Sequence, residues 1–110
     1  PFPGDNKDCW IYVEDCAEQM IQLSLKEQLN YFVYNSGSET VSGTELAKFV
    51  KEFIPDAQIT FDNKGSYTPF IDIQDDSRIR KELAFEPKTL KEGIREHINE
   101  ARKTNNLPIL

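Results

Sequence analysis

The segment WIYVEDCAEQMI, residues 10–21, decides the fold. Residues 9–13 form a short aromatic and β-branched run, which is the composition of a strand buried on both faces. Asp15 follows, with Glu18 three residues later, so the pattern predicts that Asp15 caps a helix beginning at Cys16. A strand that leads directly into a capped helix is the unit of an α/β sheet. Along that helix the predicted apolar face consists of Ala17, Met20, Ile21, Ser24 and Leu25.

Length and charge narrow the class of protein. The 110 residues allow one domain, residues 1–110, and the net charge of −6 without a basic cluster argues against nucleic acid and anionic membranes as partners. No apolar run approaches the roughly 18 residues that span a bilayer, and we find no N-terminal leader, so we expect a cytoplasmic protein with no membrane partner. Because the chain opens at Pro1 and its sole methionine is Met20, we expect it to be a piece of a longer protein.

Three further strands are predicted. Residues 31–35 are nearly all aromatic or β-branched, and residues 58–61 alternate as a half-buried strand does. Residues 69–73 suit an edge strand, because proline is tolerated at the start of one. Residues 36–39 and 62–68 are predicted loops.

Three further helices are predicted from their caps. Ser42 with Glu45 and Thr89 with Glu92 have the spacing of capping boxes, and residues 75–77 cap a short helix between them. The apolar residues expected to face the core are Leu46, Ala47, Phe49, Val50, Phe53 and Ile54 in the first of these helices, Ile79 and Leu83 in the short helix, and Leu90, Ile94, Ile98 and Ala101 in the last.

Candidate reactive groups are few. Cys9 and Cys16 are the only cysteines, and we expect two free thiols because a cytosolic protein keeps its thiols reduced. Their spacing is not C-x-x-C, and the sole histidine, His97, is expected to be exposed, so no metal site is predicted. The acidic residues at 72–76 lack the glycine and the terminal glutamate of a calcium loop.

Three motifs in order resemble the C-terminal part of one family. The third motif has two halves: residues 75–87 (DDSRIRKELAFEP) are similar to the family's D-x-S-(K/R)-x-x-x-E-L-G-(F/W)-x-P pattern, with Ala84 in place of the glycine, and residues 89–94 (TLKEGI) are similar to its L-x-(E/D)-G-(I/L) pattern. The second motif, residues 34–47, resembles the family's Y-N-(I/V)-G strand and the following helix, and the first, residues 13–17, resembles its V-x-D-x-A segment. From residue 10 to about residue 102, the chain resembles the extended short-chain dehydrogenase/reductase family, the NAD-dependent epimerases and dehydratases.

This resemblance implies a fold and two absences. The fold class is α/β, the C-terminal part of an extended short-chain dehydrogenase, with short strands and four helices, and with the Rossmann nucleotide-binding half absent. The sequence has no Gly-rich phosphate loop, and none of its tyrosines is followed four residues later by lysine, so no catalytic and no cofactor-binding residue is expected. NAD or NADP is implied for the full-length protein, in which the partner of this chain is the missing N-terminal Rossmann domain.

The resemblance also bears on the substrate. Asp8 stands where nucleotide-sugar members commonly place an arginine that clamps a diphosphate, and a second arginine usually found before the D-x-S motif is missing. A sugar or related hydroxylated substrate is therefore favoured over a nucleotide-diphosphate sugar. Lys7 is a candidate point charge, and Trp10, Tyr67 and Phe70 are candidate pocket walls. The alternative is that Lys7 and Asp8 are solvated loop charges and that the aromatic residues are ordinary core or surface residues.

Two classes of function follow. The first is the substrate-binding fragment of an NAD(P)-dependent epimerase, dehydratase or dehydrogenase, which is inactive alone. The second is a non-catalytic binding or interaction module that uses the same fold. In either case strands 9–13 and 31–35 look apolar on both sides, so the chain is expected to self-associate as a homo-oligomer, or to pair with a neighbour, through the surface at Trp10 and residues 31–34.

Overall fold

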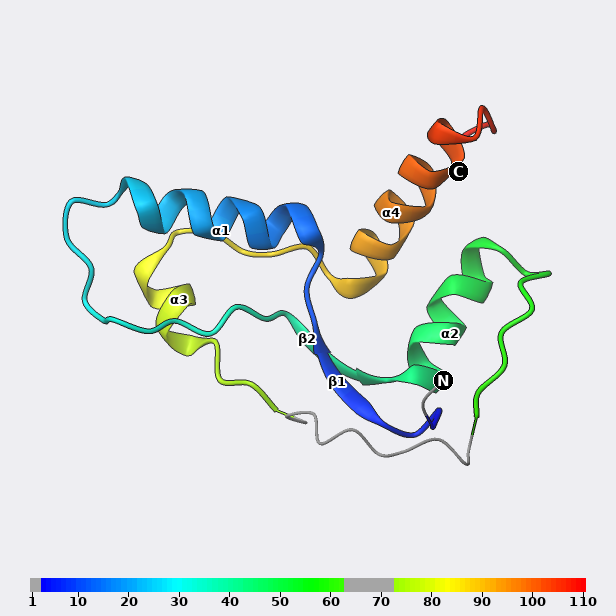
Figure 1. Cartoon of the computed structure of the whole chain (residues 1–110), viewed down its shortest axis with the longest axis horizontal. Helices are drawn as coiled ribbons and strands as arrows, with labels where there is room; N and C mark the ends of the chain where they lie inside the picture. Colours follow the sequence, from blue (N-terminus) through cyan, green and yellow to red (C-terminus); the bar gives the residue numbers. More distant parts are fainter. Residues whose placement is uncertain (1–2, 63–72) are drawn as a thin grey trace.

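The computed structural model describes residues 3–62 and 73–110 and is a small mixed α/β domain (Figure 1). In that part of the chain a two-stranded sheet lies between two pairs of helices, with α1 and α3 to one side and α2 and α4 to the other (Figure 1). The elements in chain order are β1 (Lys7–Trp10), α1 (Val13–Leu25), β2 (Glu39–Ser42), α2 (Gly43–Phe53), α3 (Ser77–Glu82) and α4 (Leu90–Thr104).

The sheet pairs β1 with β2 in antiparallel register, so that Lys7 faces Ser42 and Trp10 faces Glu39. The strand predicted at 9–13 is displaced toward the N-terminus, because helix α1 already begins at Val13. Residues 39–42, of which the first was assigned to a loop, form the partner strand β2.

The strands predicted at 31–35 and 58–61 are wrong, since neither segment is paired in the structure. Composition alone suggested them, but a strand needs a neighbour to satisfy its backbone, and Phe32 instead stands fully exposed. Most of the predicted edge strand at 69–73 lies outside the described residues; its last member, Ile73, is 79% exposed.

Helix α1 corrects the prediction for Asp15. The helix begins two residues before that position, its N-cap is Tyr12, and no side chain caps it. Asp15 is therefore inside the first turn and buried. The predicted apolar face of α1 does exist, but it is turned outward, with Met20 67% and Leu25 77% exposed. The buried residues of this helix are Asp15 and Gln19, both polar.

Helices α2 and α4 follow their predicted caps. The side-chain oxygens of Ser42 and Thr89 each accept a hydrogen bond from the backbone N–H three residues later, and the glutamates Glu45 and Glu92 bond back to the caps. Because each capping box supplies partners to helix-end amides, both helix starts are fixed in the sequence. Lys91 of α4 forms an ion pair with Glu52 of α2, so the two helices are joined at one edge.

The short helix α3 has a related cap. Its N-cap is Asp76, whose side chain makes no capping bond and instead accepts a hydrogen bond from Arg80 Nε at 2.7 Å, whereas Asp75 Oδ1 accepts a hydrogen bond from the N–H of Ser77 at 2.9 Å. The predicted buried pair in this helix is confirmed, because Ile79 and Leu83 are 2% and 3% exposed. The other buried apolar residues among those described are Tyr12, Val41 and Leu90. These few side chains are the apolar core of the described part of the domain.

The predictions for the reactive residues are confirmed where the structure describes them. Cys9 and Cys16 are free and half-buried, and His97 is exposed. None of the helices in the described ranges, 3–62 and 73–110, is long and apolar enough to cross a membrane.

Candidate functional site

A buried ion pair joins the start of α1 to the segment before α4. Asp15 is 3% exposed, and its carboxylate accepts two hydrogen bonds from one residue: from the backbone N–H of Lys88 at 2.6 Å and from Lys88 Nζ at 3.0 Å. The Asp15 side chain raises the pKa of Lys88, and the ammonium also lies 5.1 Å from the centre of the Tyr12 ring. Both oxygens of Asp15 are therefore engaged in holding two distant segments together.

The loop before β2 joins the same cluster. Ser36 Oγ donates a hydrogen bond to the Gln19 side chain of α1 at 2.7 Å, and Ser38 Oγ donates to the Lys88 carbonyl at 3.2 Å. Gly37 lies between them, and a Cβ there would come within 2.7 Å of Cys9 Sγ. This close approach of the loop to β1 explains why a glycine stands at that position.

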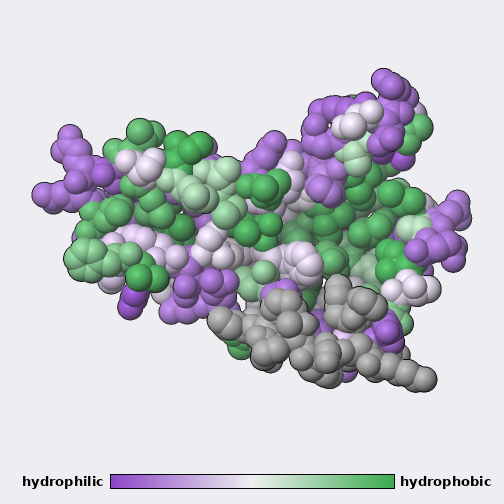
Figure 2. All heavy atoms as spheres, in the orientation of Figure 1, coloured by the Kyte–Doolittle hydropathy of each residue, from purple (hydrophilic) through white to green (hydrophobic). Residues whose placement is uncertain are grey.

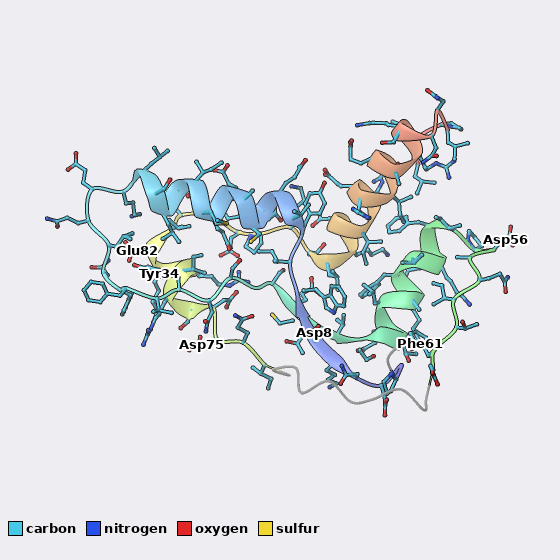
Figure 3. All side chains as sticks on the ribbon, in the orientation of Figure 1. Asp8, Tyr34, Asp56, Phe61, Asp75 and Glu82 are labelled. Carbon is cyan, nitrogen blue, oxygen red and sulfur yellow. The ribbon has the colours of Figure 1, made fainter. Side chains whose placement is uncertain are left out.

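A second buried carboxylate, Glu82 of α3, fixes the segment that follows α1 (Figure 3). Its Oε2 accepts hydrogen bonds from Asn30 Nδ2 at 2.9 Å, from the Asn30 backbone N–H at 3.3 Å and from Tyr34 Oη at 3.0 Å. Lys26 Nζ lies 3.6 Å from the other oxygen. These donors, the Asn30 side chain first, lower the pKa of Glu82, while desolvation and the Glu82 charge raise the pKa of Tyr34.

Together these contacts connect residues that come from all three motifs. Asp15 belongs to the first motif, Tyr34 and Asn35 to the second, and Asp75 and Glu82 to the third. Asn35 Nδ2 donates to the Asp75 carbonyl at 3.0 Å, and the neighbouring Tyr34 donates to Glu82 at 3.0 Å. Asp15 and Glu82 each accept hydrogen bonds from donors in distant segments, so both carboxylates link parts of the fold.

The predicted substrate-binding residues that the structure describes share one strand but not one face. Lys7, Asp8 and Trp10 all lie on β1, where alternation puts Asp8 and Trp10 on one face and Lys7 on the other. Lys7 is exposed, and Asp8 Oδ1 accepts a hydrogen bond from the N–H of Cys9 at 2.9 Å. Trp10 lines an apolar groove between α2 and α4. Tyr67 and Phe70 lie outside the described residues.

The structure gives no candidate metal centre in the residues it describes. No three of the His, Cys, Asp and Glu side chains among residues 3–62 and 73–110 are grouped so that they could hold a metal ion. The absence of a metal site, predicted from the sequence, stays a prediction.

Two residues central to the network were missed as such from the sequence. Asp15 was assigned to a cap, and Lys88 was given no role, although it stands between the two halves of the third motif. A pair separated by 73 residues leaves no local signal in one sequence. The role of Glu82 was also missed, but the sequence did contain a signal for it. The third motif places this acid directly before Leu83, which was predicted to be buried, and a buried acid requires a partner.

Comparison of the chain with protein-family models, with curated proteins and with solved structures finds no match. The relationship to extended short-chain dehydrogenases therefore rests on the motifs and stays a proposal.

Proposed function

We propose that this chain is the substrate-binding C-terminal portion of a cytoplasmic NAD(P)-dependent epimerase, dehydratase or dehydrogenase of the extended short-chain type. It would act on a sugar or a related hydroxylated substrate and would be inactive alone. The observation that carries this proposal is that the three family-like motifs, which are far apart in the sequence, are joined by the contacts of Asp15, Tyr34, Asn35, Asp75 and Glu82. Contacts that link the three motifs within one domain support this proposal.

In this proposal, a second half of the protein would supply the dinucleotide-binding site that this chain lacks. Its dinucleotide would provide hydride transfer, held by a Gly-rich phosphate loop that this sequence does not contain. The present chain would contribute Lys7, Asp8 and Trp10 of β1 from the substrate side. The outward apolar face of α1 and the exposed residues Tyr31, Phe32 and Val33 offer that half a surface to cover (Figure 2). Intramolecular interfaces between such halves commonly bury about 600–1,500 Å².

The second candidate is a non-catalytic interaction module, and one observation favours it. The carboxylates most deeply buried in the described residues, Asp15 and Glu82, are both engaged in structural bonds, whereas several exposed apolar residues lie on α1 and at 31–33. Exposed apolar residues of this kind are suited to binding a partner. The two candidates share the fold and differ in whether a nucleotide-binding half accompanies it.

The first test is cofactor binding. Calorimetric titration of the 110-residue chain with NAD and with NADP is expected to give only heats of dilution, because the amides that would cradle a pyrophosphate are not encoded in it. Micromolar binding of either dinucleotide would contradict the proposal.

The second test separates the two candidates. The coding sequence directly upstream of Pro1 is expected to encode a G-x-x-G-x-x-G loop and a Tyr-x-x-x-Lys pair, and the longer chain should bind NAD or NADP in the same titration. An upstream sequence without either motif would favour the interaction module.

A further inference from the structure

A groove with an apolar lining runs between α2 and α4 and has a volume of about 390 Å³. Figure 2 shows hydrophobic residues gathered in the recess between these two helices. We call it the α2–α4 groove; its main lining residues are Trp10, Tyr12, Leu46, Val50, Ile94 and Ile98. Its size falls in the range of roughly 300–1,000 Å³ that is typical of small-molecule sites.

One polar atom in this lining is unsatisfied. The Trp10 Nε1 is buried, and among the described residues it has no hydrogen-bond partner. Buried donors nearly always have a partner, so an orphaned indole N–H in the wall of a groove indicates that an acceptor is supplied from elsewhere. Because the atom is covered in the structure, a bond to a molecule in the groove would require the indole ring to rotate.

The charges near the α2–α4 groove restrict the chemistry of the ligand that would accept a hydrogen bond from Trp10. Burial raises the pKa of Tyr12, and the nearby carboxylates of Glu14, Glu96 and Glu100 raise it further, against the opposing effect of Lys88. An anion would be repelled by these carboxylates, and a simple ammonium has no lone pair for the indole to bond. His97 is exposed and is the sole residue with a basic side chain among the described residues that line the groove.

We propose that the α2–α4 groove binds a neutral, largely apolar molecule that carries one hydrogen-bond acceptor, such as an aromatic ketone, and that Trp10 Nε1 donates to that acceptor. The groove supplies apolar contact from both helices, and the indole supplies orientation. This site shares Trp10 with the proposed substrate side, but it does not rest on the proposed function, since it requires neither a dinucleotide nor a second half of the protein.

A pair of probes tests this on the unaltered chain. Prodan is a neutral naphthalene with a dimethylamino group and a propionyl ketone, and its emission shifts to the blue in apolar surroundings. It is expected to bind saturably with such a shift. N,N-dimethyl-2-naphthylamine has the same rings and amine without the propionyl group, and its affinity, measured by displacement of Prodan, should be at least about five- to tenfold weaker than that of Prodan, because it loses the hydrogen bond to Trp10 as well as the contact of the ethyl group. Equal affinities, or no saturable binding, would overturn the proposal.

Three variants locate the site. Trp10→Phe keeps an aromatic ring without the N–H and should weaken Prodan binding about five- to tenfold, while leaving the naphthylamine unchanged. Ile98→Phe places a larger side chain in the lining of the groove, which leaves less room, and it should weaken the binding of both probes. The double variant Met20→Gln/Ile21→Gln alters the exposed face of α1 and should affect neither probe. Far-ultraviolet circular dichroism checks each fold; if Trp10→Phe does not fold, the probe pair and Ile98→Phe decide. Loss of binding in the α1 variant, with Ile98→Phe unaffected, would place the probe on α1 and refute the groove site.

Discussion

Helices α1 and α4 have similar lengths, 13 and 15 residues, and opposite relations to the rest of the domain. Helix α4 begins with a capping box and turns apolar residues inward, with Leu90 7% exposed. Helix α1 has no side-chain cap and turns its apolar residues outward, with Leu25 77% exposed. The comparison shows that α4 is held by apolar packing and α1 by polar bonds from Asp15 and Gln19.

This difference indicates the role of α1 in the domain. A helix that buries its polar side and exposes Val13, Met20, Ile21 and Leu25 leaves apolar area in contact with water, which is unfavourable by about 25 cal/mol for each Å². Exposed patches above a few hundred Å² usually mark an interaction surface. The polar network thus fixes α1 in position, and its apolar side stays available for another layer.

The largest expected effect comes from breaking the polar attachment of α1. Asp15→Ala should lower the free energy of unfolding by about 3 kcal/mol, because it leaves the Lys88 amide and ammonium without their buried acceptor. Urea denaturation at pH 7 measures the change.

Glu14→Ala is the matched control for that substitution. Glu14 is exposed in the same first turn of α1, and its replacement should alter stability by no more than about 0.5 kcal/mol. If Asp15→Ala cost only about 1 kcal/mol, the effect would be no larger than that of the helix cap that the sequence had predicted at Asp15, and the bonds to Lys88 would contribute little.

The second effect is a dependence of stability on pH that comes from Glu82. Its folded pKa lies below the usual 4.5, so its carboxylate stabilises the fold fully above that pH, and the stabilisation is lost as the pH falls through the folded pKa. Glu82→Gln should therefore be less stable than the unaltered chain at pH 7, by less than the loss at Asp15, and the difference should shrink below pH 4.5. Chemical denaturation over a series of pH values gives the curve.

Glu86→Gln serves as the control for Glu82. Glu86 is paired with Arg80, but its side chain is 81% exposed, so its replacement should have little effect at any pH. A difference between Glu82→Gln and the unaltered chain that is constant from pH 7 to pH 3 would show that the charge of Glu82 does not matter to the fold.

The third effect contrasts one serine in each class of helix. Ser42→Ala removes the side-chain cap of α2 and should cost about 1 kcal/mol. Ser24→Ala on α1 removes only an exposed bond to the Ile21 carbonyl, and it should be neutral or slightly stabilising because alanine is the better helix former. Thermal unfolding of both variants measures the contrast. Equal losses would mean that the capping box is not what fixes the start of α2.

The sequence predicted the helices better than the sheet, and the reason is locality. Ser42 with Glu45 and Thr89 with Glu92 interact over three residues, so each capping box could be identified and is present in the structure. The segment 31–35 has the composition of a strand, but pairing depends on a neighbour that composition does not specify. The apolar period of α1 gave the residues that share a face and could not say that this face is turned outward.

The site was predictable only in part, for a similar reason. The motif residues Asp15, Tyr34 and Glu82 could be singled out by resemblance, but their partners lie 48 to 73 residues away. One sequence contains no record of which distant residues meet. The burial of a carboxylate is likewise a property of the assembled fold, so Asp15 appeared to be a cap when it is half of a buried ion pair.

The substitution with the smallest expected effect on stability, Met20→Gln/Ile21→Gln, should nevertheless clearly change the self-association of the chain. Met20 and Ile21 are 67% and 52% exposed, so Met20→Gln/Ile21→Gln removes little buried area and should leave the free energy of unfolding within about 0.5 kcal/mol. We expect the unaltered chain to self-associate through α1 and residues 31–33, rather than through Trp10, which is half-buried. Sedimentation at several concentrations should then show the double variant shifted toward monomer.

Leu107→Gln is the control, because Leu107 is 53% exposed on the C-terminal tail, away from α1, and its loss should not change the sedimentation. If the unaltered chain sediments as a monomer at every concentration, the outward face of α1 does not bind a second copy. A longer chain that carries a nucleotide-binding half should then also be monomeric, with Met20 and Ile21 protected from solvent. If they stayed accessible in that longer chain, the face would have no covering partner within the protein, and the interaction module would become the better account.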